Sequence, residues 1–98
     1  MAKVYVIGSM MEASEINRVC EALVSLKHTV RCVTLIKTTY KDAVQECYKN
    51  IEWSDIVVVI AKSDGSIGES VTHELCFAEF LDKSVYIIRR NEGGRNYN

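Results

Sequence analysis

Four short apolar runs alternate with longer segments in which apolar residues recur every three or four positions. The runs cover residues 3–7, 29–36, 55–60 and 84–88, and their β-branched and aromatic residues predict strands. "KVYVI" and "DIVVVI" are almost continuously apolar, as in strands buried on both faces, whereas "TVRCVTLI" alternates in part, as an edge strand does. The longer segments predict helices over 13–27, over 39–53 and from about Ser70 onward.

Each predicted helix has an apolar stripe that marks the side expected to pack on a sheet. The stripes are Ile16, Val19, Cys20, Leu23 and Leu26 on the first helix, Ala43, Cys47, Tyr48 and Ile51 on the second, and Val71, Leu75, Ala78 and Leu81 on the third. The Ser70 hydroxyl is placed to cap the third helix. The polar tail over 89–98 predicts no element and is either loose or docked on a neighbour.

Strand and helix alternate with short links, which predicts a mainly parallel sheet with helices on both faces. Right-handed crossovers leave few arrangements. We therefore expect a three-layer, flavodoxin- or Rossmann-like α/β fold with a four-stranded sheet in the order 2-1-3-4. At 98 residues and 48% apolar composition, the chain is long enough for one domain, over 1–98, but not for two. Because such a core is thin, we expect a homodimer or a higher homo-oligomer.

Charge and composition limit the classes of binding partner that we expect. The formal net charge is −1, and the basic residues are scattered apart from Arg89, Arg90 and the nearby Arg95, so a nucleic-acid partner is not expected. No run approaches the ~20 apolar residues of a membrane span, and the first residues lead straight into a strand. We expect a cytoplasmic protein that contacts no membrane.

The four cysteines are far apart and form neither a CxxC pair nor a cluster with histidine. This spacing favours buried apolar thiols in a reducing compartment over a disulfide framework or a zinc site. The sequence contains no GxGxxG or GxxxxGK[ST] loop and no GxSxG elbow. We therefore expect no metal and no cofactor.

Two polar loops should lie side by side, because ligands of such sheets bind beyond the carboxyl ends of the strands where the strand order reverses. "GSMMEASE" follows the first strand, and "DGSIGES" precedes the third helix. Their backbone N–H groups suit an anion or a sugar, although glycine and serine are also ordinary turn formers. The candidate contacts are Gly8, Ser9 and Met10 from the first loop, and Asp64, Gly68, Glu69 and Ser70 from the second.

Glu74 lies one turn into the third helix at the margin of its stripe, where it is either a solvated side chain or a carboxylate over the crevice. The positive end of the helix should keep it ionised, as a nucleophile requires. Tyr5 either reaches the crevice with its hydroxyl or is structural. His73 directly precedes Glu74, and adjacent residues of a helix face different directions, so His73 is not expected beside the Glu74 carboxylate. Asp64 and Glu69 are candidates for a second carboxyl group.

Three blocks, "VYVIGSM", "IEWSDIVVVI" and "DGSIGESVTHELCFAEFLDKSVYII", resemble the nucleoside 2-deoxyribosyltransferase-like family. This family includes transferases that exchange nucleobases on deoxyribose and hydrolases that cut the N-glycosidic bond of nucleotides. The resemblance implies that Glu74 is the nucleophile and that Tyr5 touches its carboxylate. It also implies that Gly8 and Ser9 form the substrate-facing turn and that Ser70 contacts a phosphate or a sugar.

The chain departs from the family pattern at several positions. Cys47 and Gly68 stand where the transferases have aspartates, and Met10 and Met11 stand where nucleotide-cleaving relatives have an arginine. The interpretation we favour is an enzyme that cleaves or transfers at the N-glycosidic bond of a small nucleoside or nucleotide through Glu74. Hydrolysis is favoured over transfer because a small open site excludes water poorly. The alternative is a catalytically inactive nucleotide-binding module of the same fold.

Overall fold

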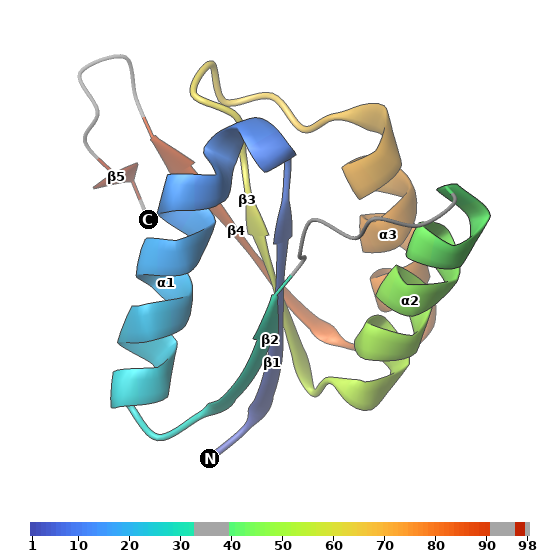
Figure 1. Ribbon diagram of the computed structural model, residues 1–98, viewed down its shortest axis with the longest axis horizontal. Helices are drawn as coiled ribbons and strands as arrows, with labels where there is room; N and C mark the ends of the chain where they lie inside the picture. Colours follow the sequence, from blue (N-terminus) through green and yellow to red (C-terminus); the bar gives the residue numbers. More distant parts are fainter. Residues whose placement is uncertain (33–39, 91–95, 98) are drawn as a thin grey trace.

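The structure, a computed structural model, describes residues 1–32, 40–90, 96 and 97, and it has three layers (Figure 1). One helix covers one face of the sheet, and two helices cover the other. The elements are β1 (Lys3–Gly8), a short 3-10 turn η1 (Met10–Glu12), α1 (Ala13–Ser25), β2 (Thr29–Cys32), α2 (Tyr40–Trp53), β3 (Ile56–Ile60), α3 (Glu69–Phe80), β4 (Ser84–Arg90) and β5 (Asn96–Tyr97).

Four parallel strands run in the order β2-β1-β3-β4, so the predicted fold class and strand order are confirmed. In register, Val6 of β1 lies between Cys32 of β2 and Val58 of β3. A fifth strand was not predicted. The short β5 pairs antiparallel with the end of β4, with Tyr97 opposite Arg89, so part of the polar tail belongs to the sheet.

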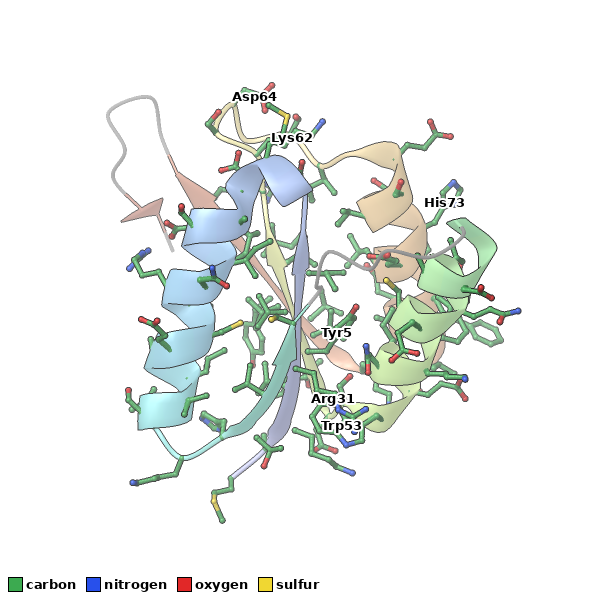
Figure 2. The ribbon with its side chains drawn as sticks, in the orientation of Figure 1. Tyr5, Arg31, Trp53, Lys62, Asp64 and His73 are labelled. Carbon is green, nitrogen blue, oxygen red and sulfur yellow. The ribbon has the colours of Figure 1, made fainter. Side chains whose placement is uncertain are left out.

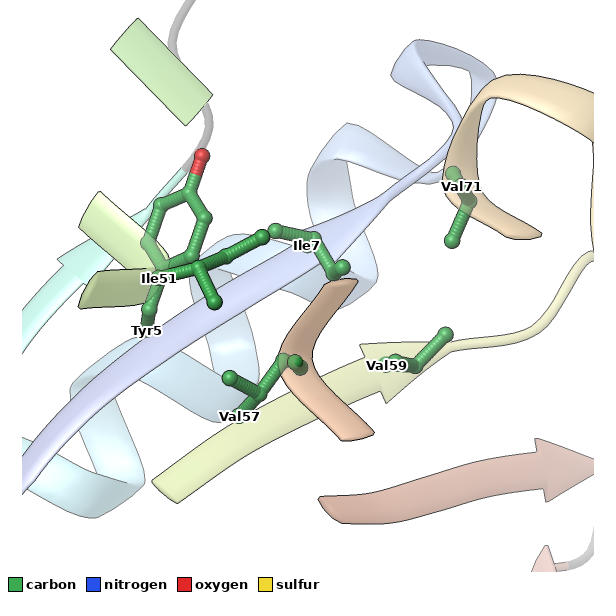
Figure 3. Close-up of a cluster of buried hydrophobic side chains, with 7 residues drawn as sticks. Tyr5, Ile7, Ile51, Val57, Val59 and Val71 are labelled. Atoms are coloured by element: carbon green, nitrogen blue, oxygen red, sulfur yellow. The ribbon is translucent and has the colours of Figure 1, made fainter. Parts of the chain in front are cut away.

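The core consists of two apolar clusters, one on each face of the sheet. Because side chains alternate along a strand, Val4 and Val6 of β1 face α1, whereas Tyr5 and Ile7 face α2 and α3. The first cluster contains Tyr5, Ile7, Ile51, Val57, Val59, Val71 and Ala78 (Figure 3). The alternation of β1 therefore determines that Tyr5 meets α2.

The predicted helices match the structure with small differences at their ends. The first ends at Ser25, and Leu26, which was predicted to lie in its stripe, is exposed. The third begins at Glu69 after the N-cap Gly68, so the prediction that Ser70 caps it is wrong. Thr72 donates its backbone N–H to the Gly68 carbonyl at 2.9 Å, which is already a helical bond, and Ser70 thus lies within the first turn.

Two other predictions, on the second strand and on the cysteines, agree with the structure only in part. The predicted strand over 29–36 is seen as far as Cys32, and its remainder, like Thr39 of the predicted second helix, lies outside the described residues. All four cysteines have free thiols, but Cys76 on α3 is exposed, so the prediction that every cysteine is buried is wrong. Within the described ranges, no helix is both long and apolar enough to cross a membrane.

Candidate active site at the carboxyl ends of β1 and β3

The turn after β1 lies directly against the end of β3. A methyl group on Gly8 would come within 3.0 Å of the Ile60 carbonyl oxygen, so this close approach requires glycine. Ser9 then starts the short 3-10 turn, because its hydroxyl accepts the Met11 N–H at 3.2 Å and its carbonyl accepts the Glu12 N–H at 2.8 Å. The side chain of Met10 lies outside the described part of the chain.

The loop between β3 and α3 is held by Asp64. Its carboxylate accepts the Ser66 backbone N–H at 2.9 Å and the Ser66 hydroxyl at 2.6 Å, and these bonds hold the pKa of Asp64 below its ordinary value. Gly65 completes the turn with a φ of 86°. Asp64 is exposed at the tip of the loop (Figure 2) and does not belong to the walls of the two cavities described next.

Two cavities share Glu74 and Ser70 as a common wall. The first, which we call the Tyr48 cavity, has a volume of about 180 Å³ and is lined by Ala43, Val44, Cys47, Tyr48, Ser70, His73 and Glu74. The second, the Lys62 cavity, has a volume of about 400 Å³ and is lined by Gly8, Ser9, Lys62, Gly68, Glu69, Ser70, Val71 and Glu74. The two polar loops thus lie side by side, as the strand order predicts.

The Glu74 side chain is partly buried and lines the Tyr48 cavity together with Cys47. Burial raises the pKa of Glu74 above its ordinary value of 4.5, and hydrogen bonding with Cys47 acts in the opposite direction. The positive end of the helix was expected to keep Glu74 ionised, but its burial in the structure opposes the charged form.

Tyr5 is only 1% exposed. Burial raises the pKa of its phenol far above the ordinary value; hydrogen bonding with Cys47 acts in the same direction and hydrogen bonding with Asn50 in the opposite one. Burial likewise raises the pKa of Cys47 to about 11, so this thiol carries its proton at neutral pH. The resemblance implies a direct contact between Tyr5 and Glu74. Tyr5 is not among the residues that line either cavity, whereas Cys47 and Glu74 both line the Tyr48 cavity.

Other polar groups surround the carboxylate. The Glu69 side chain is 94% exposed, and its Oε1 lies 3.9 Å from Nε2 of His73, which lines the Tyr48 cavity (Figure 2). Tyr48 stacks on Phe77 with 4.6 Å between the ring centroids. Lys62 and Tyr48 line the cavities although the sequence did not point to them as site residues. The signal for Lys62 is its position, two residues after the end of a buried parallel strand.

Among the described residues, no three His, Cys, Asp or Glu side chains are grouped so that they could hold a metal ion. The arrangement offers a partly buried carboxylate, a protonated thiol, an imidazole and a lysine side chain around two cavities that share part of their wall. Such a set can bind a polar ligand and attack an electrophilic carbon with the carboxylate.

The described elements define a doubly wound α/β protein with its candidate site at the point where the strand order reverses. No protein-family model matches the sequence, and no curated protein matches it. Among solved structures, the chain is similar to the 2-desoxiribosyltransferase from Leishmania mexicana, with a TM-score of 0.77 and 13% sequence identity. The alignment covers 100% of this chain and 79% of that chain. This similarity shows the fold that the resemblance implied, and no more than the fold.

Proposed function

We propose that the protein breaks the N-glycosidic bond of a nucleoside or nucleotide, with Glu74 as the nucleophile. The observation that carries the proposal is the position of the Glu74 carboxylate on the wall shared by both cavities. A sugar bridging the two cavities would present its anomeric carbon to this carboxylate. The shared fold with a 2-desoxiribosyltransferase supports the same reaction class.

The chemistry takes two displacements. A Glu74 carboxylate oxygen forms a bond to the anomeric carbon while the bond to the base nitrogen breaks, and the base leaves with a proton from a donor beside it. His73 is the imidazole available for that role on the wall of the Tyr48 cavity. A water oxygen then attacks the same carbon while the bond from that carbon to Glu74 breaks, and the proton of the water passes to His73, which frees the sugar and restores both side chains. A second base in place of the water gives transfer.

The two cavities suit the two ends of such a substrate. The Tyr48 cavity has an aromatic and apolar wall for a base, from Ala43, Val44 and Tyr48. The Lys62 cavity has an ammonium group and the Ser9 and Ser70 hydroxyls, which suit a sugar and its 5′-phosphate. Hydrolysis is favoured over transfer, because access to Glu74 from two sides leaves room for water.

The test is base release from a panel of deoxynucleosides and their 5′-monophosphates, followed by chromatography. The key variant is Glu74→Gln, which keeps the shape and removes the charge. Glu79→Gln makes the same change on the exposed side of the same helix. We expect release by the wild type and by Glu79→Gln but not by Glu74→Gln. Equal release by both variants would exclude Glu74 as the nucleophile.

A second candidate is a nucleotide-binding module without turnover. The observation that favours it concerns the carboxylates in the cavity walls. Among the described residues, Glu69 is the one other carboxylate there besides Glu74, and its side chain is almost fully exposed. Cys47 also stands where the transferase pattern has an acid. Calorimetric titration with the same panel distinguishes the two functions, since binding without base release by the wild type supports the module.

A further inference from the structure

The loop between β3 and α3 contains a closed turn over residues 62–66. The backbone N–H of Lys62 donates to the Ser66 carbonyl at 2.9 Å, and the Gly65 N–H donates to the Lys62 carbonyl at 2.8 Å. Asp64 adds two more bonds, because its carboxylate accepts from the backbone N–H and from the hydroxyl of Ser66. Both backbone polar groups of Lys62 are therefore used within the turn.

The same loop is attached to β4, the neighbouring strand, at two consecutive residues. The Ala61 N–H donates to the Ile88 carbonyl at 2.9 Å, which extends the pairing of β3 with β4 one residue beyond Ile60. Next along β4, Nε of Arg89 donates to the Gly65 carbonyl at 3.2 Å. The first bond holds the start of the loop, and the second holds the far side of the turn.

The Lys62 side chain runs from this turn to the start of α3. A methyl group on Gly68 would lie 3.5 Å from Cε of Lys62 and 3.6 Å from its Nζ, so the ammonium end lies beside the residue that precedes α3. Both residues line the Lys62 cavity. Among the described residues, no carboxylate forms an ion pair with Lys62. The position of its ammonium group therefore depends on the backbone from which the side chain starts.

Arg89 is itself held by the sheet. Its backbone pairs with Tyr97 of β5, and the preceding residue, Ile88, pairs with Ile60 of β3. The Nε–H is the guanidinium donor nearest the backbone, so few side-chain torsions separate β4 from the carbonyl that it binds. Arg89 is exposed and lines neither of the two cavities. Its bond to Gly65 thus ties the turn to a strand whose position the sheet determines.

We propose that Arg89 is a positioning residue for Lys62. By binding the Gly65 carbonyl, it holds the turn over 62–66, and with it the Lys62 ammonium group, at the wall of the Lys62 cavity. The attraction between an ammonium group and a phosphate depends on their separation, so a held ammonium group binds a phosphate more strongly. Arg89 thus favours nucleotides over nucleosides from outside the cavity. The inference rests on the proposed function in one respect, since it takes the 5′-phosphate as the group that Lys62 binds.

The decisive variants are Arg89→Gln and Arg89→Met. The amide nitrogen of Gln is as many bonds from the backbone as Nε of Arg, so Gln keeps a donor for the Gly65 carbonyl, whereas Met has a methyl group at that place. Both variants remove the same charge, so the long-range attraction of an anion changes equally. Arg89 is exposed and belongs to neither core cluster, so neither variant disturbs the core. Arg18→Met makes the same change on α1 and is the control for the loss of a surface charge.

The first readout needs no ligand. NMR order parameters of the Lys62 and Gly65 amides measure how rigid the turn is, with values of about 0.85 for rigid backbone and below about 0.6 for flexible backbone. We expect the wild type, Arg18→Met and Arg89→Gln to have rigid values and Arg89→Met to have clearly lower ones. Equal values for Arg89→Gln and Arg89→Met would overturn the proposal, whether or not the protein binds a nucleotide.

The second readout is the affinity for the four common deoxynucleoside 5′-monophosphates and for the matching nucleosides, measured by calorimetric titration. Arg89→Met should bind the monophosphates about threefold more weakly than Arg89→Gln, as expected for residues that are energetically coupled. The two variants should bind the nucleosides equally, whereas a general loss of structure would weaken both kinds of ligand.

The same two variants are then compared in a Lys62→Met background. The difference between them should vanish there, because the group that Arg89 positions is gone. A difference that persists in Lys62→Met, or equal monophosphate affinities when Lys62 is present, would contradict the proposal. If the wild type binds no monophosphate, the nucleotide form of the proposed function fails, and the order parameters alone decide whether Arg89 positions Lys62.

Discussion

Tyr5→Phe removes one oxygen from the most buried polar group beside the candidate site. The ring stays in the core, where Tyr5 is 1% exposed and packs with Ile7, Ile51 and Val57. What is lost is a buried hydroxyl whose pKa responds to the buried Asn50 side chain. A buried polar group left without its hydrogen-bond partner costs about 1–3 kcal/mol. For a domain of this size that lowers Tm by roughly 4–24 °C.

The matched control is Tyr86→Phe. Tyr86 lies on β4 and is 61% exposed, so water replaces whatever its hydroxyl loses. We expect a change within about 0.5 kcal/mol for this variant. Urea unfolding gives both values, and Trp53, the single tryptophan of the chain, is the fluorescent reporter. The slope of the free energy of unfolding against urea should not change, because the same surface is exposed on unfolding.

The comparison has a clear negative outcome. If Tyr5→Phe and Tyr86→Phe unfold at the same urea concentration, then the Tyr5 hydroxyl contributes nothing beyond a solvated one. In that case the buried Tyr5 hydroxyl has no stabilising polar partner in the core, and the assignment of Tyr5 to the candidate site fails.

Three further predictions concern the walls of the two cavities. Burial raises the pKa of Glu74. The stability that its protonation contributes is therefore complete below the ordinary pKa of 4.5 and is lost as pH rises through the pKa of the folded state. Glu74→Gln should unfold at a higher urea concentration than the wild type at pH 7, and this difference should vanish in acid. Lys62→Met should raise KM for 5′-monophosphates about tenfold, or ~1.4 kcal/mol, and leave KM for nucleosides unchanged in steady-state assays. Gly8→Ala should cost about 1–3 kcal/mol in urea unfolding because its methyl group meets the Ile60 carbonyl, whereas Gly68→Ala, whose methyl group would have no neighbour closer than 3.5 Å, should cost less.

Much of the fold follows from local pattern. Apolar runs and helical stripes located the four parallel strands and three helices, and the rules for crossovers then led to the order β2-β1-β3-β4. The same reasoning brought the turn at Gly8 beside the loop before α3. These features could be predicted because periodicity records which face of each element is buried, and a parallel sheet gathers its strand ends at one edge.

The sequence by itself therefore determined the architecture and the edge of the sheet where the two polar loops meet, and the three quoted blocks pointed to Glu74. Only the tertiary structure decided that Cys47 and Tyr48 of α2 line a cavity with Glu74 of α3 and that Lys62 lines the second one. The physical reason is that a periodic pattern specifies the buried face of a helix but not its register against its neighbours. Whether two side chains meet across elements depends on that register, which arises when the whole core packs.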